Sequence, residues 1–407
     1  MRRHHRARPG SARRAGATAA VDYPSAQPAR RRSGPLLVAG LILLVTGPAN
    51  VAADVLVVGP ERSLKAPSDA AAVAKDGDVV RIDPGEYVDC AVWRASGLTL
   101  EAPDGAAHLR DKACAEKAIW VIAGDDVTVD NITFSGARVP DQNGAGIRAE
   151  GQNLTVRNAR FFDNENGILA GARDGSTILI EASEFARNGK CAANCAHGVY
   201  VNRIDRLRIV DSVFYDQRVG HHVKSGARRT EITGSRIEDG PEGTASYLID
   251  IVAGNEAVIA DNVMQKGPRS ENSGTAIHIS GDVATAGATT YRINGNRFRS
   301  DNPHQVAFVR NRTVVPAVLE SNQIEGDVVP LVGPGTVDSE QPTPVQAVAR
   351  EQPAEPVPAP GGEEPAAGPA AWDDLEAKLR LLKRLFDEEL INDKEYATKK
   401  AELLKDF

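Results

Sequence analysis

Short stretches of alternating apolar and polar residues recur along residues 127–324, and each ends on a large apolar side chain. Eight of them superpose without gaps: VTVDNITF (127–134), LTVRNARF (154–161), ILIEASEF (178–185), LRIVDSVF (207–214), TEITGSRI (230–237), AVIADNVM (257–264), YRINGNRF (291–298) and AVLESNQI (317–324). Their last residues lie 23 to 34 positions apart. Alternation with a period of two predicts strands, and a repeat of this length predicts a solenoid or a propeller.

A second apolar strand is predicted shortly after six of the repeats: GIRA (146–149), GILA (167–170), GVYV (198–201), HVKS (222–225), LIDI (248–251) and AIHI (276–279). Two or three strands per repeat are too few for a propeller blade, which needs four. We therefore predict an all-β fold, a right-handed parallel β-helix over residues 54–333, with one coil per repeat. The terminal apolar residues, mostly Phe, should stack inside. Corners with positive φ are expected at the polar or small residues that precede them: Asn131, Asn158, Asp211, Gly234 and Asp261.

The start of the array predicts a cap. Ser68 is placed to cap a short helix over residues 69–74, which would cover the first open strand edge before the strand Val79–Ile82. The run SDAAAVAKDGDVVRIDPGEY (68–87) and the repeats together resemble the pectate-lyase-like β-helix proteins. This resemblance implies the fold and leaves the activity open, because one fold hosts many activities.

Side chains alternate along each strand, which predicts a lateral face. If Ile147, Ile168, Val199, Val223, Ile249 and Ile277 point inward, their neighbours form an outward column in the order Arg148, Leu169, Tyr200, Lys224, Asp250 and His278. His222 is expected to point outward on the other side of Val223, with His197 and His221 close by. An exposed polar column on successive coils is where solenoids bind ligands.

The residue types in this column suit chemistry at C5 of a uronic acid. Lys224 or Arg228 could neutralise the sugar carboxylate, His222 or His221 could serve as base, and Tyr200 as acid or second base. Hydrolysis needs paired carboxylates, and calcium-dependent elimination needs several, whereas Asp250 is the one carboxylate of the column. The candidate catalytic residues are thus His222, Lys224, Tyr200 and His221. The candidate substrate-binding residues are Arg148, His197, Arg228, Tyr247, Asp250 and His278.

In residue types this set resembles β-helix alginate epimerases and lyases, although the Asp-Pro-His-Asp motif of the epimerases is absent. The stretches AHGVYV (196–201), GHHVKS (220–225), GTASYLIDI (243–251) and QKGPRSEN (265–272) resemble exported bacterial right-handed parallel β-helix repeat proteins, a group without a settled activity. The leading hypothesis is an acidic-polysaccharide lyase or C5 epimerase that needs no cofactor and no metal. The alternatives are a non-catalytic glycan-binding or envelope-scaffold protein, and an adhesin.

Four cysteines fall in the part expected to be exported. Cys90 and Cys114 lie one coil length apart, so adjacent coils at ~4.8 Å would bring them within disulfide range. Cys191 and Cys195 could close a small loop, or could bind a metal together with His197. Two disulfides suit an oxidising compartment.

The two ends of the chain differ from the middle. Residues 1–53 join an Arg-rich stretch to the apolar run Leu36–Val45, which predicts a secretory signal cut after Ala53 or, alternatively, an uncleaved membrane anchor. Either reading places the protein in the periplasm, outside the cell or at the envelope. Residues 334–371 read as a Pro-rich linker. The two helices expected in 372–407 resemble the short C-terminal (SHOCT) domain, which implies self-association or a protein partner.

The distribution of charge along the chain restricts the classes of partner that the protein is expected to bind. Residues 1–53 contain nine Arg and one acidic residue, which leaves 39 basic and 54 acidic side chains in the remainder. A protein this acidic is not expected to bind nucleic acid, because such binding depends on Lys and Arg side chains that neutralise phosphates. The lateral face, with Arg, Lys and His side chains, is the predicted local exception, suited to an acidic polysaccharide.

Overall fold

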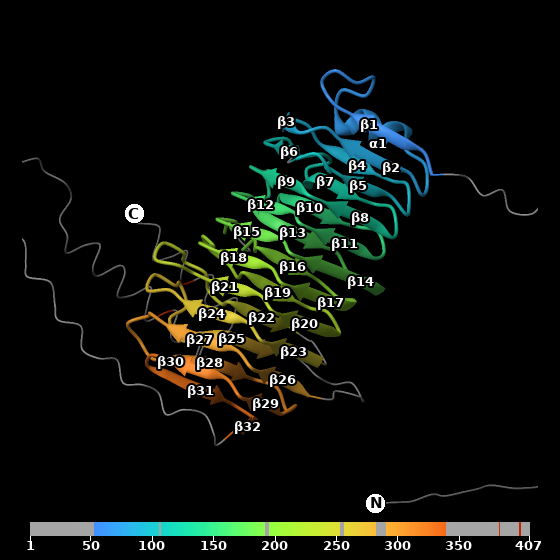
Figure 1. Ribbon diagram of the computed structural model, residues 1–407. Helices are drawn as coiled ribbons and strands as arrows, with labels where there is room; N and C mark the ends of the chain where they lie inside the picture. The colour runs from blue at the N-terminus through green and yellow to red at the C-terminus, as the bar shows by residue number, and fades with distance from the viewer. Residues whose placement is uncertain are drawn as a thin grey trace, which may run out of the picture.

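The computed structural model describes residues 53–105, 107–191, 195–252, 256–281 and 290–338, together with Leu382 and Lys399. Three parallel sheets run along this part of the chain, because each coil contributes one strand to each sheet in turn (Figure 1). The strands of a sheet pair only with the coils before and after, in register apart from one irregularity between Arg173 and Thr177. The prediction of a parallel β-helix is confirmed.

Sheet A has twelve strands: β1 (Val55–Val58), β2 (Val79–Ile82), β5 (Thr99–Glu101), β8 (Val127–Asp130), β11 (Leu154–Arg157), β14 (Arg173–Glu181), β17 (Ile204–Val210), β20 (Arg229–Thr233), β23 (Glu256–Ala260), β26 (Tyr291–Asn294), β29 (Ala317–Glu320) and β32 (Gly335–Val337). Sheet B has ten: β3 (Gly85–Tyr87), β6 (Ala107–Arg110), β9 (Ile132–Ser135), β12 (Arg160–Phe162), β15 (Glu184–Ala186), β18 (Val213–Tyr215), β21 (Arg236–Glu238), β24 (Val263–Lys266), β27 (Arg297–Ser300) and β30 (Gln323–Glu325). Sheet C also has ten: β4 (Ala91–Trp93), β7 (Ala118–Ile122), β10 (Ala145–Ala149), β13 (Asn166–Ala170), β16 (Val199–Val201), β19 (Val223–Ser225), β22 (Ile249–Val252), β25 (Thr275–Ser280), β28 (Val306–Asn311) and β31 (Val328–Val332).

The corner between sheets A and B lies where the repeats predict it. Each eight-residue repeat is a sheet A strand, a corner of one or two residues and a sheet B strand. Asn131, Asn158, Asp211 and Asp261 have φ of 57°, 51°, 49° and 57°, and Gly234 has 62°. Positive φ is tolerated by Gly, Asn and Asp, which explains why these residue types recur at the corner.

A column of aromatic side chains fills the interior. The rings of Phe134, Phe161, Phe185 and Phe214 stack on successive coils, with centroids 5.2, 4.7 and 4.6 Å apart. The register then continues through Ile237, Met264, Phe298 and Ile324, as the superposition of the repeats predicts. Stacked, fully buried rings contribute both apolar burial and ring–ring attraction, so this column is the centre of the core.

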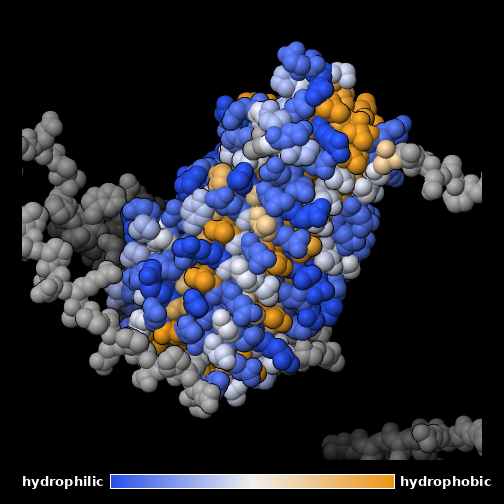
Figure 2. All heavy atoms as spheres, in the orientation of Figure 1, coloured by the Kyte–Doolittle hydropathy of each residue, from blue (hydrophilic) through white to orange (hydrophobic). Residues whose placement is uncertain are grey.

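The helical cap is present but begins earlier than predicted. Helix α1 spans Pro67–Val73, with Ala66 at the N-cap. Pro67 occupies the first turn, where proline is favoured, and the Asp69 carboxylate accepts the N–H groups of Lys65 and Ala66. The prediction that Ser68 caps the helix is therefore wrong. Around α1, Figure 2 shows an apolar area at the end of the rod, where Val55 and Val73 are about half exposed.

Both predicted disulfides are present. Cys90 pairs with Cys114 across adjacent coils, with Cα atoms 5.4 Å apart, and Cys191 pairs with Cys195. The alternative of a metal site at Cys191 and Cys195 is wrong, because the two sulfurs are bonded to each other.

Replacing Cys90 and Cys114 together by Ala should lower the free energy of unfolding by between about 3 and 4 kcal/mol, because the bridge closes a loop of 24 residues in the unfolded chain. Urea denaturation measures the change. Replacing Cys191 and Cys195 is the matched control, and the loss there should be near 2 kcal/mol, since the separation is only 4 residues. Equal losses for the two bridges would contradict the explanation that the stabilisation depends on the length of the closed loop.

The last coil extends a few residues beyond the predicted boundary at residue 333, because β32 pairs with β29. The signal segment before residue 53, most of the predicted linker and the SHOCT-like unit lie outside the described residues, apart from the helical positions Leu382 and Lys399. Their roles stay predictions. Within the described part of the chain, no helix is long and apolar enough to cross a bilayer.

Candidate functional site

Sheet C carries the predicted lateral column. Strands β10, β13, β16, β19, β22 and β25 pair in exact order, so that Tyr200 lies beside Lys224, Lys224 beside Asp250, and Asp250 beside His278. All six residues predicted to face inward are completely buried: Ile147, Ile168, Val199, Val223, Ile249 and Ile277. The register thus places a phenol, an amine, a carboxylate and an imidazole on four consecutive coils.

A ladder of aromatic rings runs beside this column. His197, His221 and Tyr247 each stand two positions before the inward-facing residue of a sheet C strand, so they occupy equivalent places on consecutive coils. The rings of His197, His221, Tyr247 and His278 stack in this order, with centroids 4.7, 4.9 and 4.7 Å apart. We call these four residues the ring ladder. Its first three members lie on the same coils as Tyr200, Lys224 and Asp250, which belong to the column on sheet C.

Backbone hydrogen bonds determine which ring nitrogens carry protons. The Nδ1 of His197 accepts the N–H of His221 at 3.0 Å, and the Nδ1 of His221 accepts the N–H of Tyr247 at 3.1 Å. A neutral imidazole that accepts at Nδ1 carries its proton on Nε2. Burial lowers the pKa of both imidazoles well below its ordinary value, and the Lys224 ammonium lowers it further. Both rings are therefore neutral donors at neutral pH.

The Asp250 carboxylate is the centre of the site. It is 4% exposed and lies 2.8 Å from Nδ1 of His278, 3.4 Å from Nε2 of His221 and 3.9 Å from Nζ of Lys224. A carboxylate accepts, so His278 donates its Nδ1 proton to Asp250. The neutral His278 ring consequently has its basic lone pair on Nε2. This is the arrangement by which a carboxylate orients a histidine that acts as a general base.

Tyr200 lies on the coil before Lys224, whereas Asp250 lies on the coil after it. Its ring packs edge-on against His197 at 5.1 Å, and Nζ of Lys224 lies 5.3 Å from its centroid. Burial raises the pKa of the Tyr200 phenol, and the nearby Asp250 charge raises it further. The phenol therefore stays protonated at neutral pH and can act as a proton donor.

His222 does not point outward as predicted. Its side chain is 1% exposed, and its Nε2 lies 2.9 Å from Oδ1 of the buried Asp239. Strand β19 begins only at Val223, after a turn in which Gly220 has a φ of 74°. The alternation of the strand therefore does not extend to His222, and the buried carboxylate supplies the partner that keeps this ring inside. Its predicted outward orientation is wrong.

Two predicted binding residues lie apart from the group. Arg228 is exposed in the connection between β19 and β20 and pairs with Asp205 at 2.8 Å. Arg148 is two coils from Tyr200, roughly 10 Å along the axis, beyond Leu169, which is 2% exposed. Its guanidinium lies 3.8 Å from Glu150. The structure thus brings together His197, Tyr200, His221, Lys224, Tyr247, Asp250 and His278, and leaves out His222, Arg228 and Arg148.

Sequence reasoning missed one cation of the column. Arg310 in β28 lies beside His278 in the register, and its Nε donates to the Thr275 hydroxyl at 2.9 Å. Among the residues that the structure describes, Arg310 has no carboxylate within ion-pair distance. The signal in the sequence was the stretch VAFVRN, whose apolar residues are too uniform to show which ones face inward.

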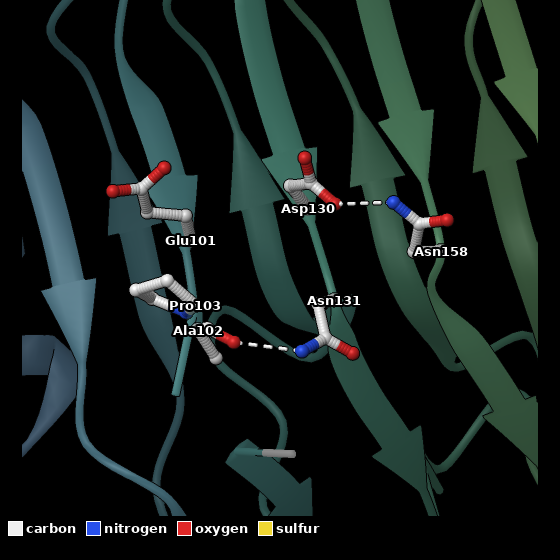
Figure 3. Close-up of a pocket in the computed structure, with 6 residues that line it drawn as sticks. All are labelled: Glu101, Ala102, Pro103, Asp130, Asn131 and Asn158. Carbon is white, nitrogen blue, oxygen red and sulfur yellow. Dashed lines mark hydrogen bonds between the residues drawn. The ribbon is translucent and has the colours of Figure 1, made fainter. Parts of the chain in front are cut away.

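A hollow lies at the corner between sheets A and B (Figure 3). Its polar groups are already engaged with one another: Asn158 donates to Asp130 at 2.8 Å, and Asn131 donates to the Ala102 carbonyl at 2.7 Å. Glu101 pairs with Arg81. This hollow is part of the corner ladder that joins the coils. Across the described ranges, no group of three or more His, Cys, Asp and Glu side chains is arranged to hold a metal ion.

Comparison with known proteins agrees with this architecture. Residues 112–264 match the family described as "Right handed beta helix region". The structure is similar to the alginate lyase from Paenibacillus sp. str. FPU-7, with 20% identity and a TM-score of 0.54 over 66% of this chain and 96% of that one. It also aligns with pectate lyase Pel9A at 14% identity and a TM-score of 0.41, over 72% of this chain and 80% of that one. No curated protein matches the sequence. The family match and the likeness to the Paenibacillus enzyme establish the fold as a right-handed parallel β-helix.

Proposed function

We propose that this protein is exported and binds an acidic polysaccharide on its lateral face, where it catalyses β-elimination or C5 epimerisation. The observation that carries the proposal is the Asp250–His278 pair on the same face as Lys224 and Tyr200. The two disulfides suit an oxidising compartment outside the cytoplasm. Uronans are the first substrates to test, because the structurally similar enzyme from Paenibacillus is described as an alginate lyase.

Each of these side chains has its own role in the proposed reaction. Lys224 neutralises the carboxylate of the uronic acid, which stabilises the enolate that forms when C5 loses its proton. Nε2 of His278 takes that proton, while Asp250 holds the ring through Nδ1 and stabilises the imidazolium. In elimination, C4=C5 forms, the C4–O4 bond breaks, and the leaving O4 takes the proton back from the His278 imidazolium. In epimerisation, C5 instead regains a proton from solvent on the opposite face. Tyr200 lies three coils from His278, roughly 14 Å along the axis, so we assign its phenol a contact with a neighbouring sugar.

The hydrogen bonds of the three histidines favour His278 as the base over His222 and His221. His222 is enclosed next to Asp239, and Nδ1 of His221 is occupied by the Tyr247 N–H. His221 would have to break this hydrogen bond before it could accept a proton from a sugar, and the unbonded Nδ1 of His222 is buried where a sugar cannot reach it. His278 has no such requirement, since its bonded nitrogen is the one that donates. We therefore assign the base to His278 and a supporting, donor role to His221.

A panel of uronans tests the proposal. Elimination gives ultraviolet absorbance from the new C4=C5 double bond, and epimerisation gives deuterium uptake at C5 from heavy water without chain cleavage. Absence of both signals on every substrate, together with retardation of the protein in a gel containing the polymer, would replace the enzyme with a non-catalytic glycan-binding or scaffold protein. Absence of binding as well would overturn the assignment of the face.

Arg310 should bind a second sugar carboxylate. It lies three coils beyond Lys224 in the same column, roughly 14 Å along the axis, a length that several sugars of an extended chain can span. We expect Arg310→Ala to weaken binding of long oligouronates about tenfold and to leave binding of the shortest ones nearly unchanged. Calorimetric titration with oligomers of increasing length measures this. Arg292→Ala, which removes an exposed cation on sheet A, is the control, and an equal loss in both variants would contradict the assignment.

A further inference from the structure

A second group of ionisable side chains is buried directly behind the ring ladder. The Lys266 side chain in β24 is completely buried. Its Nζ donates to the carbonyl of Ser246 at 2.5 Å and to that of Ala245 at 3.3 Å, and lies 3.9 Å from Oδ2 of Asp239. A fully buried ammonium is costly unless it is paired and hydrogen-bonded. Here Asp239 supplies the pairing and the carbonyls of Ala245 and Ser246 supply the hydrogen bonds, so the group has a structural role.

The Asp239 carboxylate is equally enclosed. It accepts from His222 at 2.9 Å, from the Gly267 N–H at 3.0 Å and from the Ser270 hydroxyl. Burial opposes its ionisation, but the Lys266 ammonium and the His222 and Ser270 hydrogen bonds outweigh this effect and lower the pKa of Asp239. Asp239 is therefore a carboxylate, and it balances the charge of Lys266. The side chains of Lys266 and Asp239 are both completely buried.

The connection to the site runs through the main chain. The carbonyls that Lys266 binds belong to the two residues just before Tyr247. Tyr247 stacks between His221 and His278, and its N–H donates to Nδ1 of His221. That hydrogen bond keeps the His221 proton on Nε2, which faces Asp250 at 3.4 Å. The position of this turn thus determines both the stacking and the proton of the ring beside the catalytic carboxylate.

We propose that Lys266 is a positioning residue, which holds the 245–247 turn so that Tyr247 stays in the ring ladder and His221 keeps its proton on Nε2. Its importance for turnover rests on the proposed function, but the positioning itself does not. Deprotonation of Lys266 would remove a charge-assisted donor from the Ser246 carbonyl and weaken the turn. The stacking of the ring ladder and the position of the His221 proton should then change when Lys266 loses its proton, although Lys266 does not touch the substrate.

The pH at which this happens follows from the surroundings of Lys266. Burial lowers the pKa of its ammonium from 10.5 to about 8, although Asp239 and Glu271 oppose that shift. The other titratable groups packed around it are His222, which faces Asp239, and His221, whose own pKa Lys266 helps to lower. Between about 8 and 10.5 the unfolded chain binds more protons at this lysine than the folded chain, so the contribution of Lys266 to stability rises with pH. A change in the ring ladder that is caused by deprotonation of Lys266 can therefore be distinguished from unfolding, because it should occur without a loss of stability.

Nitrogen NMR of histidine-labelled full-length protein tests the proposal without any substrate. Wild-type protein at neutral pH should show His221 with an unprotonated Nδ1, and this signal should shift with a midpoint near pH 8 while thermal stability does not fall. The signal is assigned from its disappearance in His221→Gln. In Lys266→Met the shift near pH 8 should be absent, whereas Lys75→Met, which removes an exposed lysine of the N-terminal turn, should keep it.

Two outcomes would overturn the positioning role. One is a wild-type His221 signal that does not change as the pH passes 8. The other is an unchanged pH response in Lys266→Met. If Lys266→Met does not fold, the wild-type titration alone decides. An inactive protein with the expected titration would refute the proposed function and leave this inference intact. An active protein without the expected titration would refute this inference and leave the proposed function intact.

Discussion

His278→Gln should lower turnover of the uronan that the protein acts on by about 10²- to 10⁴-fold, the usual contribution of a general base. The glutamine side chain has a similar reach and can still contact Asp250, but it has no basic nitrogen. Binding should change little, since the loss concerns proton transfer and not the cation that holds the carboxylate. The measurement is kcat and KM for double-bond formation or for deuterium uptake at C5.

The control for this variant is His304→Gln, at a described histidine in the loop before β28 that lies outside the ring ladder. It should have the wild-type rate. Asp250→Asn supplies a second check, because an amide can donate to Nδ1 of His278 and so reverse the tautomer; a large loss in kcat is expected there too. A His278→Gln protein with nearly wild-type turnover would show that the base is elsewhere.

Phe185→Ala should lower the free energy of unfolding by about 3 to 5 kcal/mol, the cost of removing a buried aromatic ring and leaving a cavity. Phe185 lies in the middle of the stack, with neighbouring rings 4.7 and 4.6 Å away on both sides. Both contacts are lost at once, and rigid coils above and below prevent the gap from closing. Thermal and urea denaturation of the purified variant measure the effect.

Phe162→Ala is the matched control, because Phe162 belongs to the adjacent coil but points outward beneath Arg187. Its removal should cost clearly less than removal of Phe185. Similar losses for the two variants would mean that the interior column does not dominate the stability of the rod.

The fold was predictable because the repeat is redundant. A corner residue such as Asn131 leaves only a weak signal when taken alone, but eight superposed repeats show that Asn, Asp or Gly recurs at the place where φ must be positive. The order of the column followed from the same repeat, since strands of one sheet pair coil by coil. The helical cap was less predictable, because a serine and a proline both mark a helix start, and here Pro67 and Asp69 determined it.

The roles within the site were not predictable in the same way. His221 and His222 are neighbours, and the sequence contains nothing that distinguishes them as proton acceptors. One ring is bonded to a backbone N–H in the ladder, and the other is bonded to Asp239, a residue in the following coil. His278 was expected to bind substrate only, because the hydrogen bond from its Nδ1 to Asp250 depends on the separation of two side chains on different coils.

By itself, the sequence determined the parallel β-helix, the coil-by-coil register, the Cys90–Cys114 pair and most of the residue types on the lateral face, because each of these depends on periodic spacing along the chain. Only the tertiary structure decided which histidine is enclosed, which nitrogen carries the proton and which lysine lies behind the site. Those properties depend on burial and on hydrogen bonds between residues of different coils, and a one-dimensional pattern contains neither.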